Sequence, residues 1–247
     1  MILIILVLVL LIKYGIERYI RLYILFQPPI NFKPHPDNIT IDGINTLYFN
    51  QFPNRPVIFF CHGNACVIHQ CTHMIEFAKE HRLNLFMFDY RGYGLSTKIL
   101  PSSDSILKDG EKMFNHLNRK DVIVWGTSLG GAVATHVASL NKCKGVILMS
   151  TFSSIDDVVQ RSYGTLVSWL VGSCMNTLRS CDKISEITDK IVIVHSKEDD
   201  VIPYESGRDL YKKISHSNSL MIATTGDHCN PNLTDIDIQR IWKFLEI

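Results

Sequence analysis

Residues 122–132 read Val122-Ile123-Val124-Trp125-Gly126-Thr127-Ser128-Leu129-Gly130-Gly131-Ala132 and combine an apolar run, a glycine-rich turn and a run of small residues. The apolar run predicts a buried β-strand, and the small residues that follow predict a helix that packs closely on a sheet. Between them lies the pattern Gly-x-Ser-x-Gly. A turn of this kind exposes its serine, because Gly126 and Gly130 lack side chains that would cover it. We therefore treat Ser128 as a candidate nucleophile.

The same turn predicts a candidate anion-binding group. A sharp passage from strand to helix strains the backbone at Ser128, and the first turn of the helix leaves the Leu129 N–H unpaired. An unpaired N–H at a helix start favours negative charge nearby. The alternative interpretation is a purely structural glycine turn, so the assignment depends on residues elsewhere in the chain.

The rest of the chain alternates strand-like and helix-like patterns. Apolar runs typical of strands are Asn45–Phe49, Val57–Cys61, Leu83–Phe88, Val122–Trp125, Gly145–Met149, Ile191–His195 and Leu220–Ala223. Helical patterns occur at Val67–His81, Asp104–Leu117, Ser128–Leu140, Tyr204–Ile214 and Thr234–Leu245. This alternation predicts an α/β fold, with a mostly parallel central sheet covered by helices on both faces.

Residues with useful chemistry follow the ends of these strands. Ser128 follows the fourth strand, Asp199 lies just beyond His195, and His228 lies just beyond Ala223. Since the carboxyl ends of parallel strands meet at one edge of a sheet, a nucleophile, an acid and a base are expected to meet there. The acid is one of three consecutive carboxylates, and Asp200 is the main alternative to Asp199.

At these residues the chain resembles the α/β-hydrolases, from about residue 40 to its C-terminus. The order serine, acid, histidine is that of the family. The motifs His62-Gly63-Asn64-Ala65, Tyr90-Arg91-Gly92-Tyr93-Gly94-Leu95-Ser96 and Gly126–Gly130 resemble a branch of membrane-associated serine hydrolases that have one N-terminal anchor, and the related protein depalmitoylases. The depalmitoylases carry an N-terminal cysteine cluster, whereas the first cysteine here is Cys61. The anchored branch is therefore the closer match.

The resemblance implies roles for particular residues. It implies a catalytic triad of Ser128, Asp199 and His228. It also implies that the N–H of Ala65 is the second oxyanion donor, in addition to the N–H of Leu129. Asp199 matches the branch pattern His-Gly-x-x-Asp-x-Val, although Ser196 replaces the glycine. The segment Asp89–Gly94 is interpreted as structural, with Arg91 pairing a carboxylate or carbonyl groups.

The N-terminus predicts a membrane anchor. Ile2–Ile12 is unbroken aliphatic, and apolar residues resume after Lys13. We expect an anchor over residues 1–26, spanning or interfacial, a connector over 27–40 and a hydrolase domain over 41–247. The alternatives are a cleavable signal peptide and a buried core helix. Basic residues after the apolar run favour a catalytic domain on the cytoplasmic side.

A short lid is expected at about 152–187, where the family inserts one. Its apolar residues suit an acyl chain and are Leu166, Val167, Trp169, Leu170, Val171 and Met175. Together with the anchor, the lid favours a small-molecule or lipid-linked acyl substrate, cleaved as an ester or thioester through an acyl-enzyme. The alternatives are a general carboxylesterase or peptidase on the same triad, and a catalytically silent membrane scaffold.

Composition excludes several other classes. The 247 residues suit one large domain, and 46% of them are hydrophobic, which is ample for a core. A net charge of +1 gives no reason to expect nucleic acid as a partner. Seven cysteines without a Cys-x-x-Cys pair favour a reducing compartment over a disulfide framework or a zinc ribbon. No metal and no cofactor is expected, although His69 and His73 have the i, i+4 spacing of metal ligands.

Overall fold

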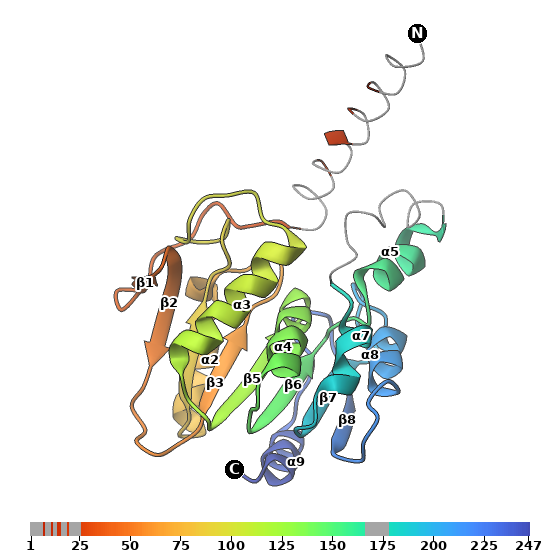
Figure 1. Cartoon of the computed structure of the whole chain (residues 1–247). Coiled ribbons are helices and arrows are strands. Elements are labelled where there is room, and N and C mark those ends of the chain that lie inside the picture. Colours follow the sequence, from red (N-terminus) through yellow and green to blue (C-terminus); the bar gives the residue numbers. More distant parts are fainter. Residues whose placement is uncertain (1–6, 8–10, 12–13, 16–18, 20–25, 166–177) are drawn as a thin grey trace.

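The computed structural model describes residues 7, 11, 14, 15, 19, 26–165 and 178–247. An eight-stranded sheet forms its centre, with the strand order β1-β2-β4-β3-β5-β6-β7-β8 (Figure 1). The strands are β1 (Ile39–Ile41), β2 (Ile44–Phe49), β3 (Val57–Cys61), β4 (Asn84–Phe88), β5 (Val122–Thr127), β6 (Gly145–Met149), β7 (Ile191–Ser196) and β8 (Ser219–Thr224). Neighbouring strands from β4 to β8 in the sheet are parallel, and β1 and β2 form an antiparallel edge.

Helices lie on both faces of this sheet (Figure 1). They are α2 (Thr72–Glu80), α3 (Ser103–Leu117), α4 (Leu129–Leu140), α5 (Ile155–Tyr163), α7 (Ser180–Lys183), α8 (Tyr204–Tyr211) and α9 (Asp235–Leu245), with 3-10 turns at Ile68–Gln70 and Ile184–Glu186. The predicted fold class, a mostly parallel α/β-hydrolase sheet covered on both sides, is confirmed.

The two faces of the sheet form two separate apolar clusters. Successive strand side chains point to opposite faces, so Phe59 and Val124 belong to one cluster and Ile58 and Ile123 to the other. The first cluster packs against α3, α4 and α8, and the second packs against α2 and α9. Because the central strands are buried on both faces, they are apolar at nearly every position.

Several elements differ from the sequence prediction. The predicted helix Val67–His81 is divided into a 3-10 turn and α2 at Cys71, since the Ile68 N–H donates to the buried Asp89 carboxylate at 2.8 Å and holds the first turn at the sheet edge. The strand β1 and the helices α5 and α7 were not predicted. β1 has three residues and α7 has four, and the nine residues of α5 are fewer than the window of about 11–18 residues in which helical periodicity is assessed.

The terminal segments bear on the predicted anchor and lid. Most of residues 1–26 and the six apolar lid residues lie outside the described residues. Phe26, the last residue of the predicted anchor, is 1% exposed and belongs to the first core cluster. Of the predicted lid, the structure describes α5 and α7. Within the described ranges, no helix combines the length and apolarity needed to cross a bilayer.

Candidate active site

Ser128 lies at the junction of β5 and α4 with a strained backbone. Its φ of 54° and ψ of −120° are unusual for a residue with a side chain. The conformation is held by hydrogen bonds: the Ser128 N–H donates to Met149 O at 2.9 Å, and the Thr151 hydroxyl donates to Ser128 O at 2.8 Å. A Cβ at Gly130 would overlap the Cys61 carbonyl, so α4 approaches β3 closely only because residue 130 is glycine.

His228 connects Ser128 to Asp199. Its Nε2 lies 3.0 Å from the Ser128 hydroxyl oxygen, and its Nδ1 lies 2.9 Å from Asp199 Oδ2. The three residues come from loops after β5, β7 and β8, and Ser128 and His228 are 100 positions apart in the chain. The imidazole therefore joins a hydroxyl on one side to a carboxylate on the other.

Asp200, the alternative acid, takes a different position. Its Oδ1 accepts a hydrogen bond from the His228 backbone N–H at 3.2 Å, rather than from the ring. Glu198 accepts the Gly226 N–H at 2.9 Å. The two flanking carboxylates thus fix the loop that carries His228, while Asp199 alone of the three contacts the imidazole.

The Asp199 side chain is buried, and its carboxylate accepts several hydrogen bonds. Burial raises the pKa of this carboxyl, but hydrogen bonds from His195, His228 and the Ile202 N–H outweigh burial and hold its pKa well below the ordinary value. His195 Nε2 lies 3.3 Å from Asp199 Oδ2 and 2.9 Å from Ile202 O. The carboxylate is therefore charged and fixed in place between two histidines.

His195 is a site residue that the sequence reasoning missed. It was interpreted only as the last residue of a strand, although it is fully buried and touches the acid. A polar residue that ends an otherwise apolar strand, four positions before the acid, was the available signal. Such a residue needs a buried partner, and the nearest acid was the natural choice.

The loop that carries Ala65 lies against Ser128. A Cβ at Gly63 would lie 3.4 Å from the Ser128 Cβ, and Ala65 has a φ of 50°. Within residues 26–165 and 178–247, the N–H groups of Ala65 and Leu129 donate to no protein acceptor. Two N–H groups without a protein acceptor, one next to the serine in the chain and one in the loop that lies against it, suit a negatively charged oxygen.

The segment Asp89–Gly94 holds this loop in place. The Tyr90 hydroxyl donates to His62 O at 2.9 Å, and the Tyr93 hydroxyl donates to Asn64 Oδ1 at 2.8 Å. Buried Asp89 accepts the Ile68 N–H on the far side of the loop. The segment Asp89–Gly94 therefore has a structural role, because its side chains hydrogen-bond to the loop beside Ser128 and hold it in position.

Arg91 and His62 are ionisable residues in or next to the segments that hold the Ala65 loop. Arg91 pairs with the buried Asp109 at 2.6 Å, as the sequence interpretation anticipated for a carboxylate partner. Burial lowers the pKa of His62, against the opposing effect of Asp89 at 3.7 Å. A buried His62 is consistent with a packing role, since its ring lies 4.4 Å from the Tyr90 ring, centroid to centroid.

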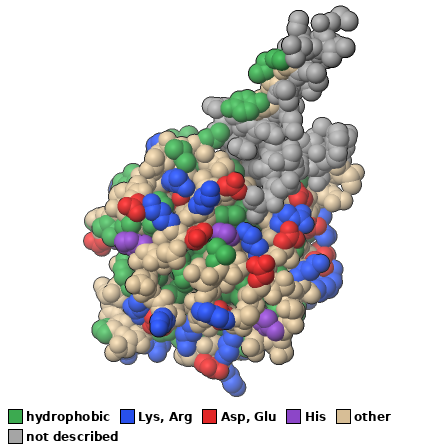
Figure 2. Space-filling view, in the orientation of Figure 1, with side chains coloured by type: hydrophobic (Ala, Val, Ile, Leu, Met, Phe, Trp, Pro, Cys, Tyr) green, Lys and Arg blue, Asp and Glu red, His purple; other side chains and the backbone are tan. Residues whose placement is uncertain are grey.

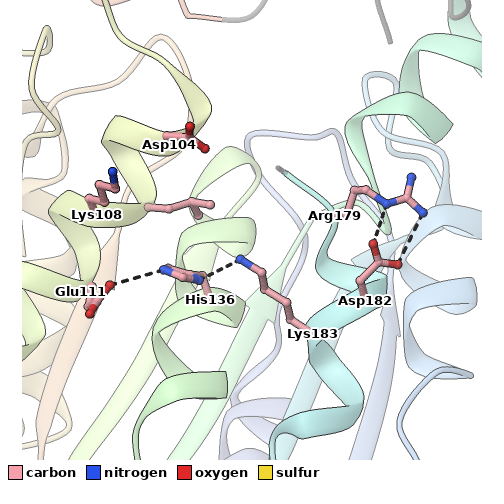
Figure 3. A pocket seen from close by; sticks show the side chains of 8 residues that line it. Asp104, Lys108, Glu111, His136, Arg179, Asp182 and Lys183 are labelled. Carbon is pink, nitrogen blue, oxygen red and sulfur yellow. Dashed lines mark hydrogen bonds and ion pairs between the residues drawn. The ribbon is translucent and has the colours of Figure 1, made fainter. Parts of the chain in front are cut away.

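A separate charged cavity of about 380 Å³ opens between α3, α4 and α7 (Figure 3). Several of its polar groups contact one another: Lys183 Nζ lies 2.8 Å from His136 Nδ1, and Arg179 forms an ion pair with Asp182 at 2.6 Å. Ser128, Asp199 and His228 do not line it. On the face shown in Figure 2, acidic and basic side chains are interspersed.

Fold and site together have the form of a hydrolase with a serine, histidine and aspartate at one sheet edge. The model of the α/β hydrolase fold matches residues 56–170. An uncharacterized protein of Acanthamoeba polyphaga mimivirus is 32% identical over 225 residues, which cover 81% of this chain and 75% of that protein. The chain belongs to the α/β-hydrolase family.

Other relatives carry the family name. The alpha/beta hydrolase domain-containing protein 17C of Xenopus tropicalis is 27% identical over 203 residues, which cover 78% of this chain and 62% of that protein. The chain spans 58% of the human protein of the same name. The shared name agrees with the α/β-hydrolase resemblance, and the family supports a hydrolytic function.

Solved structures agree on the fold. The mouse alpha/beta hydrolase domain-containing protein 10 superposes with a TM-score of 0.68 at 16% identity, covering 85% of this chain and 96% of that one. A monoacylglycerol lipase from Paleococcus ferrophilus gives a TM-score of 0.62 at 15% identity, covering 82% and 97%. At these identities the likeness concerns the fold alone.

Proposed function

We propose that the chain is a serine hydrolase that cleaves an ester or thioester through a covalent acyl-enzyme on Ser128. The observation that carries this proposal is the His228 ring, with one nitrogen 3.0 Å from the Ser128 hydroxyl and the other 2.9 Å from Asp199. A serine hydroxyl is a weak nucleophile until a base accepts its proton, and this imidazole is in position to do so.

The proposed reaction has two halves. The Ser128 oxygen attacks the substrate carbonyl while His228 Nε2 takes the hydroxyl proton, and Asp199 stabilises the imidazolium and fixes the tautomer with Nδ1 protonated. The oxyanion is stabilised by the N–H groups of Ala65 and Leu129. His228 then gives its proton to the leaving alcohol or thiol. Water, activated by the same histidine, releases the acid and regenerates Ser128.

We further propose a lipid-linked acyl substrate presented at a membrane through the N-terminus. The support is the aliphatic run Ile2–Ile12 in the sequence, together with apolar surface near the Ala65 loop. A groove of about 440 Å³ is lined by residues of 28–32 and 92–98. Ile30 and Leu95 in that groove are 92% and 46% exposed. Tyr93, which contacts the Ala65 loop through Asn64, lies on the same segment as Leu95.

Activity-based labelling tests the first proposal. A fluorophosphonate probe should label the wild-type chain, and Ser128→Ala should abolish labelling. The matched control is Ser139→Ala on the same helix, where the serine hydroxyl only donates to His136 O, and labelling should persist. An unlabelled wild-type chain would contradict the hydrolase proposal and favour a silent scaffold.

Substrate preference tests the second proposal. Hydrolysis of p-nitrophenyl esters and acyl thioesters is to be measured across acyl chain lengths, with and without detergent micelles. A kcat/KM that rises with chain length supports a lipid-linked substrate. A preference for short esters or peptides would instead indicate a general carboxylesterase or peptidase on the same residues.

A further inference from the structure

Two cysteine side chains meet directly behind the Ala65 loop. Cys66 follows Ala65 in the chain, and its Sγ lies 3.2 Å from the Sγ of Cys71. Both thiols are free. The one turn of 3-10 helix between them brings the thiols together, since the Gln70 N–H donates to Val67 O at 2.8 Å and the Cys71 N–H to Ile68 O at 3.0 Å.

The two thiols differ in accessibility. Cys66 is partly exposed, whereas Cys71 is 2% exposed and packs in the second core cluster. An oxidant from solvent therefore reaches Cys66 first. Cys71 is then the nearest thiol to any oxidised form of Cys66, and it is shielded from solvent itself.

The thiols also differ in acidity. The hydrogen bond from Cys71 lowers the pKa of the Cys66 thiol, against the opposing effect of burial. The same bond, followed by burial, raises the pKa of Cys71. A more acidic, accessible thiol beside a buried second thiol is the arrangement found in cysteines that sense oxidants.

We propose that Cys66 and Cys71 form an oxidation site, in which a peroxide converts the thiol pair to a disulfide next to the Ala65 loop. In the first step the Cys66 thiolate attacks hydrogen peroxide, which leaves a sulfenic acid on Cys66 and releases hydroxide. In the second step the Cys71 sulfur displaces the sulfenic oxygen, and one water is released. Two thiols are oxidised and one peroxide is reduced to water.

The disulfide has a direct structural consequence. A disulfide bond is about 2.05 Å long, so the sulfur atoms must approach one another. Cys71 is the N-cap residue of α2 and Ile68 is held by Asp89, so we expect the displacement to fall mainly on Cys66 and the adjoining Ala65. We expect this displacement to move an oxyanion donor and to slow acylation of Ser128, an expectation that rests on the proposed function.

Mass spectrometry tests the site itself, whatever the activity. The reduced full-length chain is treated with hydrogen peroxide, its remaining thiols are alkylated, and the peptide containing residues 66–71 is analysed. The expected wild-type peptide lacks both alkyl groups and is lighter than the reduced peptide by two hydrogen atoms. In Cys71→Ser, dimedone should instead trap a sulfenic acid on Cys66. Recovery of both cysteines in alkylated form would overturn the proposal.

Labelling of Ser128 tests the consequence. Peroxide should slow fluorophosphonate labelling of the wild-type chain by about 10-fold or more, because small displacements of positioning groups have effects of this size. Dithiothreitol should restore the rate. Cys66→Ser should be insensitive to peroxide, and Cys229→Ser, which removes the exposed thiol beside His228, should remain as sensitive as the wild type. A disulfide that leaves labelling unchanged would overturn the regulatory part alone.

Discussion

At the scale of single residues, Ser128 depends on the absence of neighbouring side chains. Its backbone lies in a region that favours glycine, and it stays there because strand β5, helix α4 and the Met149 carbonyl fix both sides. The strain is local and the framework around it is rigid. The residues that permit this geometry are therefore as important to the site as the residues that carry the chemistry.

Gly130→Ala tests this dependence. Its Cβ would overlap the Cys61 carbonyl, so we expect the free energy of unfolding to fall by about 1–3 kcal/mol and labelling of Ser128 to slow. Urea unfolding and fluorophosphonate labelling measure the two effects. Gly164→Ala is the control, since a Cβ there meets nothing within 4 Å and only the positive φ of 85° is strained. Equal labelling rates in the two variants would contradict the expectation.

Asp199 gives a prediction about pH. Its pKa is held below the ordinary value of about 4, so its charged form stabilises the fold above that pH, and the stabilisation is lost as the pH falls toward the folded-state pKa. The difference in unfolding free energy between wild type and Asp199→Asn should therefore shrink below about pH 4. Urea titrations between pH 3 and pH 7 measure this difference. Asp37→Asn on the surface is the control, and a pH-independent difference for Asp199→Asn would refute the assignment.

Activity provides a second readout for the same residue. Asparagine in place of Asp199 can hold His228 in the wrong tautomer, and such a change costs about 10⁴ in kcat in serine hydrolases that use a triad. We expect a loss of that order for Asp199→Asn and a much smaller loss for Asp200→Asn, whose carboxylate contacts only the backbone N–H of His228. Comparable losses in the two variants would contradict the assignment of Asp199.

At the scale of elements, the turn after β4 supports the loop after β3. Tyr90 and Tyr93 reach across to His62 and Asn64, so two adjacent parallel strands supply the loop and its support. This explains why tyrosines and glycines alternate there: the glycines permit the turn, and the buried tyrosines use their hydroxyl groups as well as their rings.

Tyr90→Phe should weaken this support. Loss of the hydroxyl leaves the buried His62 carbonyl without its donor, and we expect a cost of about 1–3 kcal/mol in unfolding free energy together with slower labelling of Ser128. Tyr211→Phe is the matched control, because its hydroxyl contacts the Ser219 carbonyl only at 3.5 Å, away from the site. A Tyr90→Phe chain with unchanged labelling would show that the loop keeps its position without this bond.

Elements of different kinds were predictable to different degrees. The buried strands Val57–Cys61 and Gly145–Met149 have the predicted bounds, because a run that is apolar on both faces ends sharply at polar residues. The strand β1 escaped prediction because it has three residues, two of them exposed. The break at Cys71 depends on Asp89, a contact between segments far apart in the chain, which periodicity within one segment does not contain.

At the scale of the whole molecule, the parallel sheet brings the candidate catalytic residues together. Each of the loops after β5, β7 and β8 contributes one residue. Their meeting at one edge was predictable because the carboxyl ends of parallel strands lie at the same edge of a sheet. The partners of Asp199 were not predictable in this way. His195 lies inside a strand, and its contact with Asp199 depends on how the following loop folds back. The same fold of the loop decides that Asp199 contacts the His228 ring while Asp200 contacts the His228 backbone N–H.

The apolar surface beside the Ala65 loop leads to a prediction about substrates. Leu95→Ser should lower kcat/KM for long-chain acyl esters by about 10-fold while leaving short-chain esters nearly unchanged, since an exposed leucine contributes roughly 1–2 kcal/mol when an acyl chain covers it. Ile236→Ser provides the control, because Ile236 is equally apolar and 70% exposed but lies on α9. Equal loss on short and long esters would argue against acyl-chain binding at this surface.

The contact between Gln27 and Asn64 has a mechanical consequence. The Gln27 N–H donates to Asn64 Oδ1 at 2.9 Å, next to the buried ring of Phe26, so a pull applied to the chain ahead of residue 26 acts on Phe26 and then, through Gln27, on the loop that faces Ser128. A tag or surface immobilisation attached at that end would load this loop directly. The same attachment after Ile247 would load the last turn of α9, far along the chain from the Ala65 loop, so the two attachment points are not equivalent for the candidate site.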